Sequence, residues 1–287
     1  LFICFRTKDS LCLTSLVTKW YRFLAHETIR LDRSLHQPGR YPHANQSIQV
    51  LLRLFRDAIE KLDNNVTSRH TSTALDLANL TLRIYFFTHT TRNCPSLMES
   101  VGRISFPLIQ FSRAQFVTYK YYTGRYKLLQ HSVSAAIDDL KLAFRHCWTN
   151  PSAYVNRRLI FFNLMVARLV VGALPCPGVL ENFGYSRLIP LIRAYKQGRI
   201  ADFHRACEAN MDLLLPSGNY CLVRERCIMP IYRNLIQRVF NLLVDRRSDK
   251  PLFVSFSNIL AALRLSTQDP TQDLMDVECL LTSMISQ

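Results

Sequence analysis

The chain has 287 residues, 48% of them hydrophobic, and a formal net charge of +15. This length and apolar content suffice for one large or two moderate domains. The 36 basic against 21 acidic residues favour a polyanionic partner: nucleic acid, an acidic protein or an acidic membrane face. The nine cysteines are scattered and form no C-x-x-C pair, which argues against a disulfide framework or a structural zinc site and favours reduced thiols in the nucleus or cytoplasm.

No targeting segment is recognisable in the sequence. It begins with Leu1 rather than Met, so we expect a fragment or an incomplete gene product. Arg6 interrupts the first apolar run before it reaches the length of a secretory signal. The apolar run Leu159–Leu180 includes Asn163 and Arg168, and a charge at the centre of a membrane span costs about 3 kcal/mol. A buried helix is therefore predicted there, and no membrane partner is expected.

Apolar residues at three- and four-residue spacing predict a series of helices in the first half of the chain. The predicted helices cover Leu1–Leu31, Ile48–Leu62, Ala74–Phe87, Leu97–Phe111, Ala114–Leu129 and Ala135–Cys147. Asp32–Ser47 contains Pro38 and Pro42 and predicts a loop, and the polar stretch Asn64–Ser72 predicts a connection.

The last two of these helices resemble a tetratricopeptide-type hairpin. Gly124 should let them approach closely, with Ala135 and Ala136 opposite. Helical spacing indicates core packing rather than base stacking for the aromatic face of Phe116, Tyr119, Tyr122 and Tyr126. The sequence shows no clean repeat of about 34 residues, so we interpret this part as a degenerate helical solenoid.

Further helices are predicted at Val155–Gly172, Leu188–Gln197, Ile200–Leu215 and Tyr220–Met229. The next helix, Ile231–Arg247, has an apolar face of Tyr232, Leu235, Ile236, Val239 and Leu243 and a second face rich in arginine and amide side chains. Ser257–Leu265 and Leu274–Ile285 follow. Asp273 is the predicted amino-terminal cap of the last helix, and its predicted buried stripe is Leu274, Val277, Leu281 and Met284.

A long helix followed by a helix, a turn and a second helix is the outline of a winged-helix core. The fold class predicted for the chain is therefore all-α: a tetratricopeptide-like helical solenoid over residues 1–215 and a truncated winged-helix module over residues 216–287. The β-hairpin that forms the wing would follow the last helix and is missing from this sequence.

The sequence gives no support for catalysis, and neither a cofactor nor a bound metal is expected. It contains no G-x-S-x-G, H-E-x-x-H, Walker or Rossmann pattern. His146 and Cys147 are neighbours that point in different directions on a helix, so a packed Cys beside a surface His is the preferred interpretation. Asp138 and Asp139 have no spaced partner and indicate a solvated helix face.

A basic cluster in the carboxy-terminal module is the candidate nucleic-acid site: Arg224, Arg226, Arg233, Arg238, Arg246, Arg247 and Lys250. Surface ion pairs or a protein interface are the competing interpretation. From Ser217 to Gln287 there are eight basic and seven acidic residues, and the last helix is acidic, so this module is nearly neutral. The solenoid carries more of the excess, with nine basic and two acidic residues between Arg113 and Arg168. Arg157 and Arg158 are predicted to extend a basic path or to bind an acidic partner.

Several stretches resemble one family. The segment Ser112–Arg125 (SRAQFVTYKYYTGR) is similar to the PCI-domain subunit of TREX-two, the nuclear-pore-associated mRNA-export complex. Weaker similarities occur at Ala143–Cys147, Asn156–Ile160, Tyr232–Leu235 and Asp276–Leu281. The resemblance covers about Leu75 to Gln287.

The resemblance implies a non-catalytic scaffold subunit in the nucleus, associated with the nuclear pore, with the cytoplasm as a second location. The implied partners are a larger GANP-type scaffold that has its own PCI domain, a small acidic peptide subunit, and RNA or DNA bound on a joint basic surface. The alternative is a PCI subunit of a signalosome- or proteasome-lid-type assembly that does not bind nucleic acid.

Overall fold

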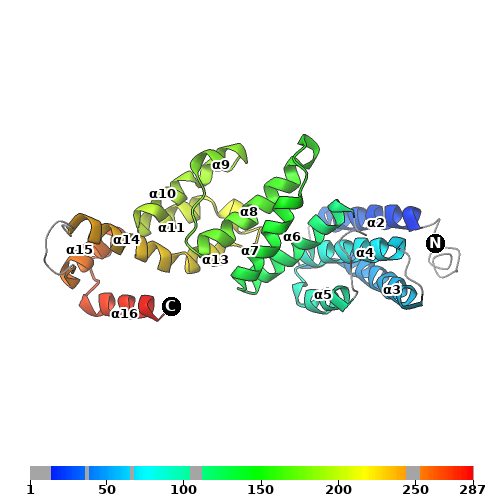
Figure 1. Cartoon of the computed structure of the whole chain (residues 1–287), viewed down its shortest axis with the longest axis horizontal. Coiled ribbons are helices and arrows are strands. Elements are labelled where there is room, and N and C mark those ends of the chain that lie inside the picture. The colour runs from blue at the N-terminus through cyan, green and yellow to red at the C-terminus, as the bar shows by residue number, and fades with distance from the viewer. Residues whose placement is uncertain (1–13, 36–38, 65–67, 104–111, 244–252, 287) are drawn as a thin grey trace. The chain divides into compact units, whose positions relative to one another are not determined.

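The computed structural model describes residues 14–35, 39–64, 68–103, 112–243 and 253–286 (Figure 1). Every regular element among these residues is a helix, so the predicted all-α class is confirmed. The chain forms two compact units, Leu1–Ile160 and Phe161–Gln287. The predicted boundary after residue 215 separates two types of fold, whereas the boundary after Ile160 separates two compact units. The predicted division therefore stays a prediction.

The amino-terminal unit is built around α4. Its described helices are α2 (Thr14–Ser34), α3 (Pro42–Asn64), α4 (Ser68–Phe87), η2 (Thr91–Asn93), α5 (Cys94–Arg103), α6 (Arg113–Leu129), α7 (Val133–His146), η4 (Pro151–Ala153) and the start of α8 (Tyr154–Val170). α4 packs against α2, α3, α5 and α6. Leu77, Leu82 and Ile84 of this helix are fully buried, because neighbours cover it on several sides. The predicted helix Leu97–Phe111 corresponds to α5, and its second half lies outside the described residues.

The predicted loop Asp32–Ser47 is too long, because Asp32 belongs to α2 and α3 begins at Pro42. Pro suits the first position of a helix, where its missing N–H costs no hydrogen bond. The buried Asp32 carboxylate accepts hydrogen bonds from the backbone N–H groups of Ala44 (2.8 Å) and His43 (3.3 Å). A residue of one helix therefore caps the next. The predicted connection Asn64–Ser72 is likewise too long, since α4 begins at Ser68.

The predicted helical hairpin is formed by α6 and α7, and Gly124 permits their close contact. A Cβ atom on Gly124 would lie 2.6 Å from Cγ of Leu140, so the residue opposite is Leu140 rather than Ala135 or Ala136. Tyr119, Tyr122 and Tyr126 pack against the core of the unit while remaining half-buried, which confirms core packing for these three rings. Phe116 instead contacts His146 edge to face.

The carboxy-terminal unit contains the rest of α8, then α9 (Pro177–Asn182), η5 (Ser186–Leu188), α10 (Ile189–Gln197), α11 (Ile200–Ala209), α12 (Met211–Leu214), α13 (Tyr220–Arg226), α14 (Ile228–Leu243), α15 (Phe256–Thr267) and α16 (Leu274–Ile285). Tyr195 and Phe203 are its largest fully buried side chains, and the Tyr195 hydroxyl donates to the Leu169 carbonyl at 2.7 Å. The predicted helix Ile200–Leu215 is interrupted at Asn210, whose side-chain amide donates back to the Ala206 carbonyl. Among the described helices, none combines the length and apolar character needed to cross a bilayer.

The predicted break at Gly198 is confirmed. This residue ends α10 in the left-handed conformation, at φ 69°, which glycine adopts without strain. It also touches α14: a Cβ atom there would lie 2.7 Å from Cα of Leu235.

The last three helices follow the predicted order, but they bury less apolar surface than predicted. On α14, Ile231 and Val239 are buried, whereas Leu243 is exposed. Asp273 caps α16 with a complete capping box, as predicted. Of the predicted stripe on α16 only Val277 is fully buried, and Leu274 is exposed, so the prediction of a buried stripe is wrong in extent.

Candidate functional site

Four arginines of the predicted carboxy-terminal basic cluster are described, and two of them are held by other parts of the unit. Arg224 on α13 donates to the Tyr220 hydroxyl at 2.7 Å and lies 3.6 Å from a Glu208 carboxylate oxygen. Arg238 on α14 donates to the Gln197 carbonyl at 2.8 Å. These contacts fix the two guanidinium groups against their own fold and reduce what they can offer to a phosphate.

Arg226, Arg233 and Arg238 are the exposed members of the described cluster, and Arg238 is the one of the three held by the Gln197 carbonyl. The guanidinium of Arg233 lies beside Gly172, where an added Cβ atom would be 3.2 Å from its Nη2 atom. Arg246, Arg247 and Lys250 lie outside the described residues, so the cluster as a whole stays a prediction. The exposed cations that the structure describes there are too few to form a broad phosphate-binding surface alone.

In the amino-terminal unit, Arg157 is half-buried at the start of α8, with its guanidinium carbon 4.6 Å from the centre of the Phe144 ring. This is a cation–π contact that the sequence pattern did not indicate. Arg158 is also half-buried. Their predicted role in a basic path stays a prediction.

The prediction that Asp138 and Asp139 form a solvated helix face is wrong for Asp139. Its side chain is 7% exposed and accepts from Lys120 (2.7 Å) and Lys127 (2.5 Å), both on α6. Burial alone would raise the pKa of Asp139, but the hydrogen bonds and charges of the two lysines outweigh burial and lower it. The buried carboxylate thus neutralises part of the positive charge that the sequence placed on this stretch.

The preferred interpretation of a packed Cys147 beside a surface His146 is confirmed. Cys147 is buried, and burial raises the pKa of its thiol, which disfavours the reactive thiolate. His146 packs against the Phe116 ring instead. Within the described parts of the chain, no group of three or more His, Cys, Asp or Glu side chains could hold a metal ion.

Exposed apolar side chains are frequent on the last three helices. We call this set the apolar surface of α14–α16: Leu242, Phe253, Phe256, Leu265, Met275 and Ile285. Leu265, Met275 and Ile285 are 82%, 72% and 86% exposed, although each is large enough to gain about 1.5–3 kcal/mol from full burial. Scattered single apolar residues need no explanation, but five on three consecutive helices, with Phe253 just before α15, are typical of a protein-contact surface. Sequence periodicity did not single these residues out, because none of them belongs to the apolar faces predicted for Ile231–Arg247 and Leu274–Ile285.

The all-helical architecture is consistent with a PCI-type helical fold. No family model matches the chain. Curated relatives nevertheless confirm the predicted resemblance to PCI-domain proteins. A PCI domain-containing protein of Schizosaccharomyces pombe is 29% identical over 296 residues, which cover 99% of this chain and 66% of the relative.

Two relatives named PCI domain-containing protein 2 homolog extend the similarity. The Dictyostelium discoideum protein is 25% identical, over 82% of this chain and 53% of the relative. The Drosophila melanogaster protein is 26% identical, over 74% of this chain and 51% of the relative. The chain thus spans between about half and two thirds of the length of these relatives, and the similarity supports a PCI-type scaffold protein.

Proposed function

We propose that the chain is a non-catalytic scaffold subunit of a nuclear mRNA-export complex. Its carboxy-terminal helices dock a second PCI subunit, a GANP-type scaffold, and its exposed arginines contribute to a surface for RNA or DNA. The apolar surface of α14–α16 is the observation that carries the proposal, because large apolar side chains this exposed on a folded unit call for a partner. The similarity to proteins named PCI domain-containing protein 2 supports the class of assembly.

The docking role is tested by binding of the purified chain to a purified GANP-type PCI domain. Met275→Glu and Leu265→Glu place a charge where an apolar contact is expected, and each should weaken binding about 100-fold or more because it buries an unpaired charge. Both positions are exposed, so the variants should fold normally. Val155→Glu is the matched control, since Val155 is 65% exposed in the amino-terminal unit. Unchanged binding of both carboxy-terminal variants would sink the docking role.

The RNA role is tested separately, by fluorescence anisotropy with an oligouridine RNA in the assembled pair of subunits. Affinity should fall with rising salt, because phosphate contacts release counterions, and it should show little base preference. The double variant Arg226→Glu with Arg233→Glu should weaken binding about tenfold or more and lower the salt slope. If RNA affinity changes neither with salt nor with the double substitution, these arginines do not contribute to RNA binding.

A PCI subunit of a signalosome- or proteasome-lid-type assembly is the second candidate. Two observations favour it: Arg224 and Arg238 are held by intramolecular hydrogen bonds, and Asp139 pairs with both Lys120 and Lys127 and offsets one of their two positive charges. A protein-only scaffold needs no free phosphate-binding cations. Normal docking of a PCI partner without salt-dependent RNA binding would favour this candidate.

A further inference from the structure

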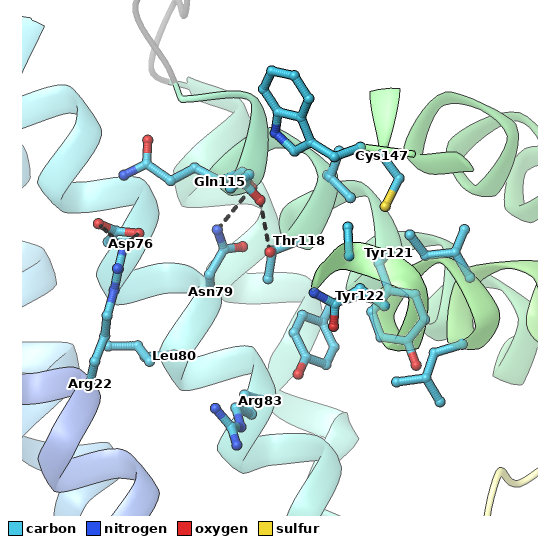
Figure 2. A pocket seen from close by; sticks show the side chains of 17 residues that line it. Arg22, Asp76, Asn79, Leu80, Arg83, Gln115, Thr118, Tyr121, Tyr122 and Cys147 are labelled. Carbon is cyan, nitrogen blue, oxygen red and sulfur yellow. Dashed lines mark hydrogen bonds and ion pairs between the residues drawn. The ribbon is translucent and has the colours of Figure 1, made fainter. Parts of the chain in front are cut away.

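A groove of about 580 Å³ lies within the amino-terminal unit, and neither the docking role nor the RNA role accounts for it. Residues of α4 and α6 line it, together with the segment that follows α7 and the start of α8 (Figure 2). Its apolar lining includes Leu80, Val117, Leu159 and Ile160. A volume of this size can hold a few side chains of a bound segment.

The aromatic rings around the groove make contacts within the chain, which leaves little free ring surface for base stacking. Tyr122 lies 5.4 Å from Phe86 and 5.2 Å from Tyr121, centre to centre. Trp148 is 53% exposed, and the guanidinium of Arg113 lies over one face of its ring at 4.4 Å. A single-stranded nucleic acid needs free aromatic faces on which its bases can stack. The groove therefore suits an apolar side chain better than a base.

Asn79 supplies a buried polar group in the lining. The residue is 6% exposed, and its Nδ2 donates to the Gln115 carbonyl at 3.0 Å, the bond drawn in Figure 2. Its Oδ1 is shut off from bulk water and has no hydrogen-bond donor among the described residues. A buried amide oxygen without a hydrogen-bond donor costs free energy, and an N–H group of a ligand that donates to it would remove that cost.

Arg83 supplies a charge at the same groove. Its neighbour Arg22 is neutralised, since Nη2 of Arg22 lies 2.8 Å from each carboxylate oxygen of Asp76. Arg83 is exposed and has no ion-pair partner among the described residues. A guanidinium in this position attracts a carboxylate from a ligand.

We propose that this groove binds a short peptide segment of a partner, in which an apolar residue lies next to an acidic one. The apolar side chain packs against Val117 and Leu159, the carboxylate pairs with Arg83, and a backbone N–H donates to Oδ1 of Asn79. The groove shares no residue with the apolar surface of α14–α16, and the proposal does not depend on the docking or RNA roles.

The test begins with selection of a random short-peptide library, displayed on phage, against the full chain, with the Arg83→Glu variant as the counter-selection. The selected peptides should be enriched in Asp or Glu beside Leu, Ile or Phe. As labelled synthetic peptides, they should lose about tenfold or more in affinity on Arg83→Glu and several-fold on Leu159→Ala. Arg53→Glu is the matched control, because Arg53 is also exposed in this unit but does not line the groove.

The Asn79 contact is tested from the side of the ligand, by N-methylating the best peptide at one backbone nitrogen at a time. Methylation at one position should weaken binding about tenfold, and the same methylation should cost nothing further on the Asn79→Leu variant. If no methylated position weakens binding, or if the loss is the same on both proteins, the assigned hydrogen bond is wrong.

Three results would overturn the proposal as a whole. One is the absence of any peptide selected above the Arg83→Glu background. Another is a selected set whose binding is unaffected by both Arg83→Glu and Leu159→Ala. The third is oligouridine RNA that binds the wild-type chain and loses affinity with the same two substitutions, which would assign the groove to nucleic acid.

Discussion

The contact between Gly198 and α14 makes a quantitative prediction for the Gly198→Ala substitution. Alanine would have to adopt φ 69°, and this left-handed conformation costs about 1–2 kcal/mol. Its Cβ atom would also lie 2.7 Å from Cα and 2.8 Å from N of Leu235, which are backbone atoms that cannot rotate away. Overpacking of this kind costs about 1–3 kcal/mol. The expected loss of unfolding free energy is therefore about 2–5 kcal/mol, or about 6–25 °C in Tm for a unit of this size.

Urea unfolding of the full chain, followed by circular dichroism, measures this loss, and two control variants separate its parts. Gly39 also has a left-handed φ, 80°, but nothing lies within 4 Å of a Cβ atom added there. Gly39→Ala should therefore show only the backbone cost. Gly178→Ala, in α9, has neither the positive φ nor a close contact and should be neutral or slightly stabilising. If Gly198→Ala costs no more than Gly39→Ala, the close packing of α10 on α14 is refuted.

Two further predictions concern buried groups. Asp139→Asn should cost about 1–3 kcal/mol near pH 7, less than a fully buried pair because Lys127 reaches solvent. Because the folded pKa of Asp139 is lowered, the stabilisation is present above about pH 4 and is lost as pH falls through the folded pKa. Urea unfolding at a series of pH values should therefore show that the unfolding free energy falls less at acid pH in the variant than in the wild type. An equal fall in both proteins would contradict the ion pairs. Burial raises the pKa of Cys94 and Cys207 from 9.0 to about 12, so at pH 8 their thiolate fraction falls about 1000-fold. Iodoacetamide labelling read by mass spectrometry should modify the exposed Cys176, Cys221 and Cys279 first, and equal labelling of the buried pair in the folded chain would be inconsistent with this core.

Local sequence signals predicted most of the helices, because they depend on residues close together in the chain. The period of apolar residues located α3, α6, α7 and α16. Gly198 predicted a helix end because its conformation is a property of the residue itself. Asp273 predicted a cap because its partner, the Asp276 backbone N–H, is three residues away.

Contacts between distant residues could not be predicted in this way. The partners of Asp139 are on another helix, 12 and 19 residues earlier, so its own neighbourhood indicated a solvated face. Asp32 was placed in a loop because its role as a cap for α3 depends on how two helices pack. Leu243 and Leu274 follow the period of a buried stripe yet are exposed, since periodicity identifies an apolar face but not what covers it.

For the candidate sites too, local signals were readable from the sequence and contacts between distant residues were not. Composition and motifs indicated a basic protein without recognisable catalytic patterns, but they could not show that Arg224 and Arg238 bind other parts of the same unit. The groove beside Asn79 was missed. A polar residue between buried apolar neighbours on α4 was the available signal, yet only the structure shows that its Oδ1 has no donor among the described residues.

Purification of the full-length protein from nuclei, with and without nuclease and read by mass spectrometry, is the most direct test of the proposed function. The account predicts that a GANP-type scaffold and a small acidic subunit are recovered in both samples, and that the scaffold is lost on Met275→Glu but retained on Val155→Glu. Recovery of signalosome or proteasome-lid subunits instead would contradict the export role while leaving the PCI-type fold unaffected.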